Sequence, residues 1–75
     1  MKTYLEMIIY SIKHMKYINN SNKYFSQIAI KKALYLLFNK ESNSLTNYYI
    51  RRALRKGVAT GVLIQNKNSY KLKSK

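Results

Sequence analysis

The sequence predicts a small α+β domain that is mostly helical, with three helices followed by a β-hairpin. Three segments carry apolar residues at helical spacing, and two loops rich in Asn and Ser separate them. The end of the chain consists of two short strand candidates around a Lys-Asn turn. Its 75 residues are enough for one domain, and no cysteine is present to form a disulfide or a thiolate zinc site. We therefore expect a single domain over residues 1–75 that is held together by one apolar core.

The first helix is predicted over residues 4–17. Thr3 and Glu6 have the spacing of a capping box, in which each side chain binds the other residue's free backbone N–H. The apolar residues that follow at helical spacing are Leu5, Ile8, Ile9, Ile12 and Met15. The helix is expected to end near Tyr17, because residues 19–22 are Asn-Asn-Ser-Asn, which is typical of a loop.

A brief edge strand and a second helix are predicted next. Residues 23–25, Lys-Tyr-Phe, form the strand candidate, and Ser26 is a good N-cap for a helix over residues 27–38. The buried stripe of this helix should consist of Ile30, Ala33, Leu34 and Leu37. The side chains that should point elsewhere are Lys31, Lys32 and Tyr35. Residues 39–44 then form the second loop.

The third helix, predicted over residues 46–59, has one apolar and one basic face. The apolar face consists of Ile50, Ala53, Leu54 and Val58. The opposite face carries Arg51, Arg52, Arg55 and Lys56, and it holds every arginine of the chain. Like charges four residues apart cost a few tenths of a kcal/mol, so the stability of the helix does not explain them. A polyanion lying on this face would explain them, and a solvated basic face is the alternative.

The hairpin is predicted over residues 62–73. Lys67 and Asn68 are expected to form a two-residue turn, in which Asn68 tolerates positive φ. This turn fixes the register of the two strands. The expected pairs are Asn66–Ser69, Gln65–Tyr70 and Leu63–Leu72. Lys71 and Lys73 then project from the other face of the hairpin. Three helices closed by a hairpin wing form a winged helix-turn-helix, an architecture that offers its last helix to DNA.

The charge of the chain indicates an anionic partner. Fifteen Lys and Arg residues against two Asp and Glu residues give a formal net charge of +13. Nucleic acid, an anionic membrane surface and an acidic protein all fit such a charge. The longest apolar run, residues 33–38, is far shorter than the ~20 residues that span a bilayer, and no secretory signal opens the chain. We therefore expect an intracellular protein.

Catalysis and metal binding are not expected. Glu6 is used by the cap, Glu41 lies in a loop, and His14 is read as an ordinary helix residue. No combination of nucleophile, base and orienting group is visible, and one histidine cannot build a metal site with two scattered carboxylates. We therefore expect a protein that is not an enzyme and has no cofactor and no small-molecule substrate.

Several segments resemble the globular domain of linker histones. Residues 3–8, T-Y-L-E-M-I, are similar to the start of its first helix. Residues 50–67, I-R-R-A-L-R-K-G-V-A-T-G-V-L-I-Q-N-K, resemble its third helix and first wing strand, and residues 69–72, S-Y-K-L, resemble its second wing strand. Taken together, the similarity covers about residues 3–73.

The resemblance implies double-stranded DNA as the partner, above all nucleosomal and linker DNA, with core histones as a further possible contact. It implies binding that is largely independent of sequence and compacts chromatin, by a monomer rather than a dimer. The expected location is nuclear chromatin, or a virion or viral DNA compartment for a virus-encoded homologue.

The resemblance also implies two basic DNA-binding surfaces. The family's primary surface uses two basic residues on helix three and a lysine at the wing, which match Arg51, Arg55 and Lys67, with Arg52 and Lys56 beside them. The second surface uses basic residues on helix one, helix two and the last strand. These match Lys16, Lys32 and Lys71, with Lys31 and Lys73 beside them.

The chain also departs from the family pattern. Only Asn68 separates Lys67 from Ser69, where the family has a Gly-rich tip, so the wing is short and the reach of Lys67 is in question. The first interhelical loop is about four residues longer. Gly57 replaces a large apolar residue, which should cost roughly 1 kcal/mol of helix propensity and thin the core. The family's lysine-rich tails are absent from this sequence, which fits an excised domain, a tailless protein, or a minimal or virus-encoded homologue.

Two other functions fit part of the sequence. A sequence-specific winged-helix regulator would use the same fold, and Asn47 is its one candidate for reading adenine, but it needs no second basic surface. Membrane binding by basic amphipathic helices is disfavoured, because the chain has no Trp and the apolar faces are needed for the core. At least one of Tyr48 and Tyr49 is expected in the core, and Tyr10 and Tyr17 are expected to be partly exposed.

Overall fold

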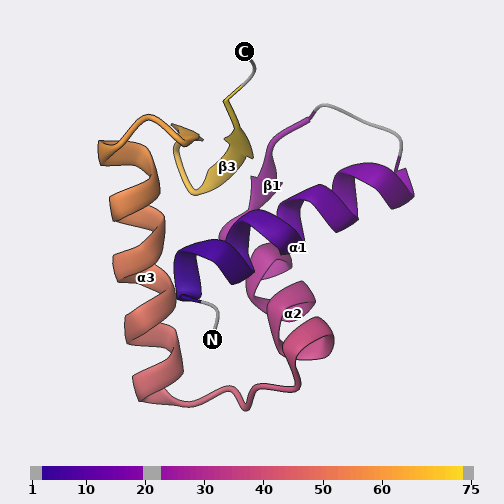
Figure 1. Cartoon of the computed structure of the whole chain (residues 1–75), viewed down its shortest axis with the longest axis vertical. Helices are drawn as coiled ribbons and strands as arrows, with labels where there is room; N and C mark the ends of the chain where they lie inside the picture. The colour runs from indigo at the N-terminus through magenta and orange to yellow at the C-terminus, as the bar shows by residue number, and fades with distance from the viewer. Residues whose placement is uncertain (1–2, 20–22, 74–75) are drawn as a thin grey trace.

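Three helices and a three-stranded antiparallel sheet make up the part of the chain that the computed structural model describes, residues 3–19 and 23–73 (Figure 1). The helices are α1 (Tyr4–Asn19), α2 (Gln27–Phe38) and α3 (Ser44–Ala59). The strands are β1 (Phe25–Ser26), β2 (Leu63–Asn66) and β3 (Ser69–Leu72), in the order β1-β3-β2. This is the α+β winged-helix fold that the sequence predicts.

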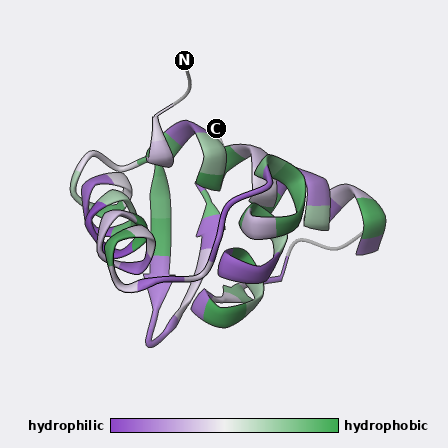
Figure 2. Ribbon diagram, turned by 90° about the horizontal axis from the view of Figure 1, so that it is seen from below, coloured by the Kyte–Doolittle hydropathy of each residue, from purple (hydrophilic) through white to green (hydrophobic). Residues whose placement is uncertain are grey.

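Helix α1 lies across the other two helices and packs against both (Figure 1). The loop between α2 and α3 runs along one end of the molecule, and the sheet closes the other end, where α2 begins and α3 ends. Along β2, the hydropathy changes from hydrophobic at Leu63 and Ile64 to hydrophilic toward the hairpin turn (Figure 2). Among the described residues, no helix has the length and apolar content needed to cross a bilayer.

The predicted capping box at the start of α1 is confirmed. The backbone N–H of Thr3 donates to Glu6 Oε1 at 2.9 Å, and the backbone N–H of Glu6 donates to Thr3 Oγ1 at 3.1 Å. The helix continues two residues beyond the predicted end, and the Asn19 side chain donates to the carbonyl of Met15 at 2.8 Å. The rest of the predicted loop, residues 20–22, lies outside the described residues.

Ser26 ends the edge strand and is the N-cap of α2. Its hydroxyl accepts a hydrogen bond from the N–H of Ala29 at 3.1 Å, so the predicted N-cap is confirmed. The predicted strand over residues 23–25 is wrong in its bounds: β1 consists of Phe25 and Ser26, which pair with Tyr70 and Ser69 of β3. Burial of the Phe25 ring explains this position, because only 5% of Phe25 is exposed.

Helix α3 begins two residues earlier than the sequence indicates. Asn43 is the N-cap, and its side-chain oxygen accepts from the N–H of Thr46 at 2.8 Å. Asn43 and Thr46 are both suitable caps by residue type, and the earlier one is used. Thr46 therefore lies within the first turn of α3, where it is buried.

The predicted hairpin register is confirmed in all three pairs, Leu63–Leu72, Gln65–Tyr70 and Asn66–Ser69. The prediction that Asn68 takes the positive φ of the turn is wrong, because Lys67 takes it, with φ 57°. The Gln65 side chain donates to the carbonyl of Lys67 at 2.8 Å and holds the turn in this form.

Every helix and strand contributes to one buried core. Its members are Met7, Ile8, Ile12, Phe25, Ile30, Leu34, Ile50, Ala53, Leu54, Leu63 and Tyr70. The predicted stripes of α2 and α3 supply most of their buried side chains, while Ala33, Leu37 and Val58 are half-buried. The prediction for Tyr35 is wrong in part, since this side chain is half-buried and packs against the core.

Gly57 does not thin the core. A Cβ atom at this position would lie 2.5 Å from Cδ1 and 2.8 Å from Cγ of Leu63, and 3.1 Å from Cδ1 of Leu5. The space that a large side chain would fill in α3 is thus occupied by a leucine from β2. The expectation from the family pattern is corrected: glycine at residue 57 lets the wing pack directly against the backbone of α3.

Candidate nucleic-acid interface

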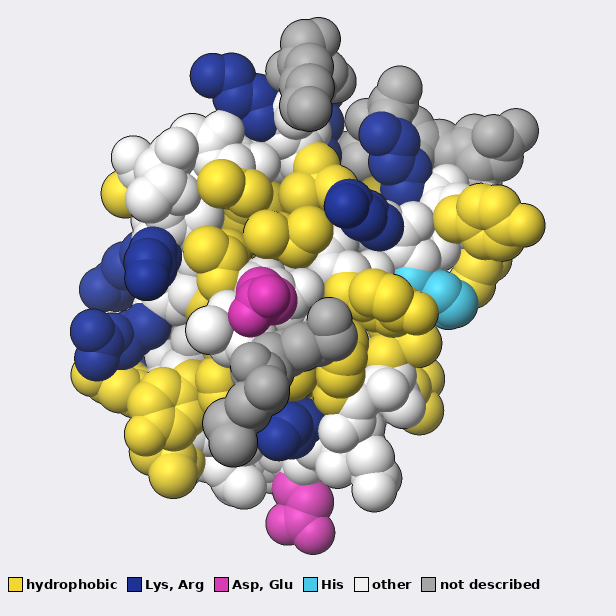
Figure 3. Space-filling view, viewed as in Figure 1, with side chains coloured by type: hydrophobic (Ala, Val, Ile, Leu, Met, Phe, Trp, Pro, Cys, Tyr) yellow, Lys and Arg dark blue, Asp and Glu magenta, His cyan; other side chains and the backbone are white. Residues whose placement is uncertain are grey.

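One side of α3 is a basic surface because the opposite side is held in the core. Residues 50, 53, 54 and 57 are buried, which leaves Arg51, Arg52, Arg55 and Lys56 exposed. In Figure 3, Lys and Arg side chains gather along the α3 side of the molecule, away from α2. We call these four residues the α3 surface, and we include Lys67 of the wing, which is also exposed and which the family resemblance assigns to the same surface.

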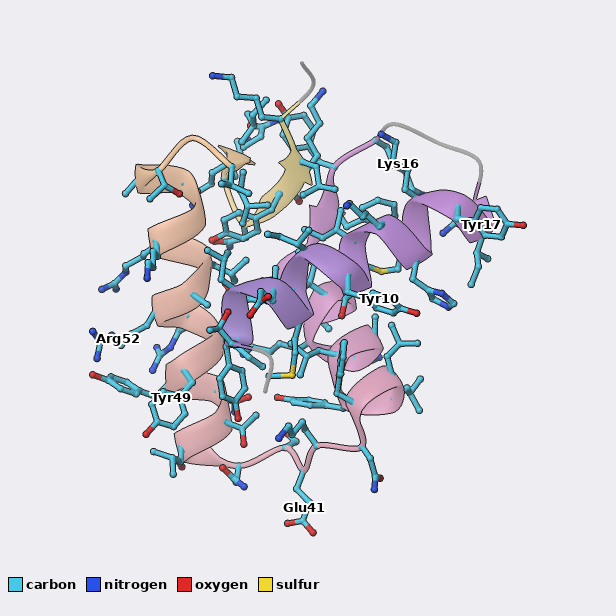
Figure 4. The ribbon with its side chains drawn as sticks, viewed as in Figure 1. Tyr10, Lys16, Tyr17, Glu41, Tyr49 and Arg52 are labelled. Atoms are coloured by element: carbon cyan, nitrogen blue, oxygen red, sulfur yellow. The ribbon has the colours of Figure 1, made fainter. Side chains whose placement is uncertain are left out.

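No carboxylate of α3 itself offsets this charge, because the helix contains neither Asp nor Glu. The chain's two carboxylates lie elsewhere: Glu6 is in the capping box of α1, and Glu41 extends from the α2–α3 loop (Figure 4). Guanidinium groups suit bidentate contacts to phosphate, and lysines act as point charges. The α3 surface therefore has the chemistry of a phosphate-binding face.

Arg52 is held along the helix by a neighbouring ring. Its Nη1 donates to the hydroxyl of Tyr48 at 3.4 Å, and its Cζ lies 5.7 Å from the centroid of the Tyr48 ring. Such a cation–π contact at an exposed site contributes about 0.5–1 kcal/mol. It orders the Arg52 side chain while leaving it exposed to a ligand.

The residues predicted for the second surface lie on α1, α2 and β3 and directly after β3. We call Lys16, Lys31, Lys32, Lys71 and Lys73 the second surface. Lys16 is exposed in the last turn of α1, on the opposite side of the molecule from Arg52 (Figure 4). Lys71 of β3 is half-buried, with its Nζ 4.9 Å from the centroid of the Tyr24 ring.

The α2 part of the second surface contains apolar side chains that the sequence reasoning missed. Lys32 is exposed, but Ile28 and Leu36, four residues before and after it, are 67% and 85% exposed. Ile28, Lys32 and Leu36 are four residues apart and lie off the buried stripe, and this spacing could have revealed the exposed aliphatic side chains from the sequence. Lys31 is half-buried and lines a pocket at the start of α2 with Ser26, Gln27, Ile28 and Asn68. The second surface is therefore a mixture of basic and aliphatic groups, unlike the face of α3.

The sequence profile of the linker histone H1 and H5 family matches residues 1–73. The chain belongs to this family. Linker histones are non-enzymatic DNA-binding proteins of chromatin, so this linker histone domain is a DNA-binding protein related to chromatin. Comparison with characterised proteins and with solved structures found no match to the chain.

The one candidate for base reading in the linker histone domain, Asn47, takes part in a contact between two helices. Recognition of adenine by Asn requires both its side-chain oxygen and its side-chain nitrogen. The oxygen of Asn47 accepts a hydrogen bond from the hydroxyl of Tyr35, which joins α3 to α2. The side-chain oxygen of Asn47 is thus already engaged within the fold, and its role as an adenine reader stays a prediction.

The prediction that Tyr48 or Tyr49 lies in the core is wrong. Both rings are exposed, at 46% and 41%, because the buried positions of α3 lie on another face of the helix. The expectation of partial exposure is confirmed for Tyr10, at 50%, while Tyr17 is more exposed than expected, at 85%. Within the described residues, no group of three His, Cys, Asp or Glu lies together to hold a metal ion.

Proposed function

We propose that this linker histone domain binds nucleosomal and linker DNA without reading its sequence, through two basic surfaces. The α3 surface would neutralise the phosphates of one duplex segment and the second surface those of another. Holding two segments together compacts the DNA. The domain acts as a monomer on chromatin, since one copy already carries both surfaces.

The observation that carries this proposal is the exposed basic face of α3 in a domain of the linker histone family. Arg51, Arg55 and the two basic residues beside them lie on one helix face with no carboxylate in that helix. Specific base contacts need hydrogen-bonding side chains that are available to the groove, and Asn47 is engaged by Tyr35. These features favour phosphate binding over a sequence-specific regulator.

Duplex binding is expected to depend steeply on salt and little on sequence. If six to eight phosphates are contacted, the logarithm of the association constant should fall against the logarithm of salt concentration with a slope of roughly −5 to −7. Fluorescence anisotropy with several duplexes of equal length and unrelated sequence measures both properties. A shallow slope, or a strong preference for one duplex, would contradict phosphate neutralisation.

Lys67 provides a separate test of the wing. A lysine in the left-handed region costs about 1 kcal/mol, and glycine adopts that conformation freely. Lys67→Gly should therefore raise the free energy of unfolding slightly, by about 0.5–1 kcal/mol, and reduce the magnitude of the salt slope by about 0.9 through loss of one phosphate contact. Chemical denaturation and salt titration measure the two effects.

Lys67→Arg is the matched control, because it keeps the charge and the backbone conformation. It should leave both the stability and the salt slope close to those of the parent. An unchanged salt slope in Lys67→Gly would show that the shortened wing does not reach the DNA.

A further inference from the structure

Three tyrosines and two cations form a connected cluster beside the α3 surface. Tyr4 of α1 stacks on Tyr49 of α3, with ring centroids 5.3 Å apart and 24° between the ring planes. Tyr49 meets Tyr48 edge-on, with centroids 5.7 Å apart. Arg52 lies over the Tyr48 ring, and Lys40 Nζ lies 6.0 Å from the centroid of Tyr4. We call Tyr4, Tyr48 and Tyr49 the tyrosine cluster.

The outer rings of this cluster are exposed to solvent. Tyr48 and Tyr49 are 46% and 41% exposed, and Leu45, one turn earlier on α3, is 61% exposed. In Figure 3, hydrophobic side chains gather directly below the basic group at the α3 edge of the molecule. Tyr49 and Arg52 extend from the same side of α3 (Figure 4). Aromatic surface and positive charge are thus presented together on one helix.

This combination matches the chemistry of a nucleotide with an unpaired base. The base is a flat ring that stacks on an aromatic side chain, and the phosphate beside it binds a cation. In a duplex the bases are paired and stacked on one another, so exposed tyrosine rings cannot lie against them. An apolar protein segment would pack on the rings but would carry no anionic group to bind the cations at both ends of the cluster.

We propose that the tyrosine cluster, with Arg52, binds the unpaired bases of single-stranded DNA. Tyr49 and Tyr48 supply the stacking surface, and Arg52 binds the adjoining phosphate. This activity differs from the proposed duplex binding, because the affinity comes from base stacking in addition to charge. It uses one residue of the α3 surface and needs no contact from the second surface.

Comparison of two single strands and two proteins tests the proposal. The strands are an oligothymidine and an oligonucleotide of equal length in which the bases are replaced by abasic sugars. The proteins are the parent chain and Tyr49→Leu, which keeps an apolar side chain but loses the ring. The parent should bind oligothymidine about tenfold more tightly than the abasic strand, which corresponds to stacking of one base. Tyr49→Leu should bind both strands equally, at the parent's affinity for the abasic strand.

Three controls make the outcome specific. Tyr49→Phe keeps the ring and should bind oligothymidine as the parent does. Tyr48→Leu should also lose most of the preference for oligothymidine over the abasic strand. This variant replaces Tyr49→Leu in the test if Tyr49→Leu does not fold, because Tyr4 stacks on Tyr49 and not on Tyr48. Blunt duplex DNA should bind the parent and Tyr49→Leu within about twofold, if stacking is confined to unpaired bases. Tyr48→Leu is compared only on the two single strands, because the Tyr48 ring also orders Arg52 of the α3 surface.

Two results would overturn the proposal. One is a parent chain that binds the abasic strand as tightly as oligothymidine, since the bases would then contribute nothing. The other is an equal loss of affinity for both strands and for the duplex in Tyr49→Leu, which would mean that the ring supports only the fold or the phosphate-binding face. Neither result would bear on duplex binding by the parent chain, which the salt titration measures separately.

Discussion

Gly57→Ala is expected to lower the free energy of unfolding by about 2 kcal/mol, the usual cost of overpacking a filled core. Helix propensity alone predicts the opposite, a gain of roughly 0.5–1 kcal/mol for alanine in a helix interior. The packing cost is larger than the gain in helix propensity, because the new Cβ would lie 2.5 Å and 2.8 Å from two atoms of Leu63. Leu63 is only 3% exposed and cannot move into solvent to make room.

Thermal and chemical unfolding measure this effect directly. For a domain of this size, the loss corresponds to a fall in Tm of about 8–16 °C. The double variant Gly57→Ala with Leu63→Ala is the control, compared with Leu63→Ala alone by denaturant unfolding at low temperature. In that background the alanine at residue 57 should be neutral or stabilising, since the two closest atoms are gone. A higher Tm for Gly57→Ala in the parent chain would show that the contact with Leu63 does not limit residue 57.

The double variant Arg51→Ala with Arg55→Ala should weaken duplex binding about a hundredfold at moderate salt. A hydrogen-bonded contact to a charged group contributes about 1.5 kcal/mol, which is close to a tenfold loss for each arginine. The magnitude of the salt slope should fall by about 2, because two phosphate contacts are lost. The stability of the fold should stay the same or rise by a few tenths of a kcal/mol, since like charges four residues apart repel.

Lys13→Ala is the matched control for the single variant Arg55→Ala. Lys13 is exposed on α1 and belongs to neither proposed surface. Its substitution removes the same unit of charge as Arg55→Ala. Anisotropy titrations should show about a tenfold loss for Arg55→Ala and less than about twofold for Lys13→Ala. Equal losses in the two variants would mean that the net charge of +13 binds DNA without a defined surface.

Features determined by neighbouring residues could be predicted from the sequence. The Thr3–Glu6 capping box, the Ser26 cap and the hairpin register each depend on residues a few positions apart, and each is confirmed. The exposed basic face of α3 follows in the same way, because helical periodicity fixes which side chains lie opposite Ile50 and Leu54.

Features that depend on contacts between distant segments could not be predicted. The role of Gly57 is set by Leu63 of β2, and the availability of Asn47 is set by Tyr35 of α2. The exposed stack of Tyr49 requires Tyr4 from the other end of the chain. Propensity and spacing carry no information about these pairings.

The most direct test of the proposed function is competition among three DNA ligands at near-physiological salt. They are a nucleosome with two linker arms, a nucleosome core without arms, and free duplex of equal length. Two-surface binding predicts a strong preference for the armed particle, and both Arg55→Ala on the α3 surface and Lys32→Ala on the second surface should reduce that preference. Equal binding to all three ligands, with losses only for substitutions in α3, would contradict it and leave a protein that binds DNA with one face.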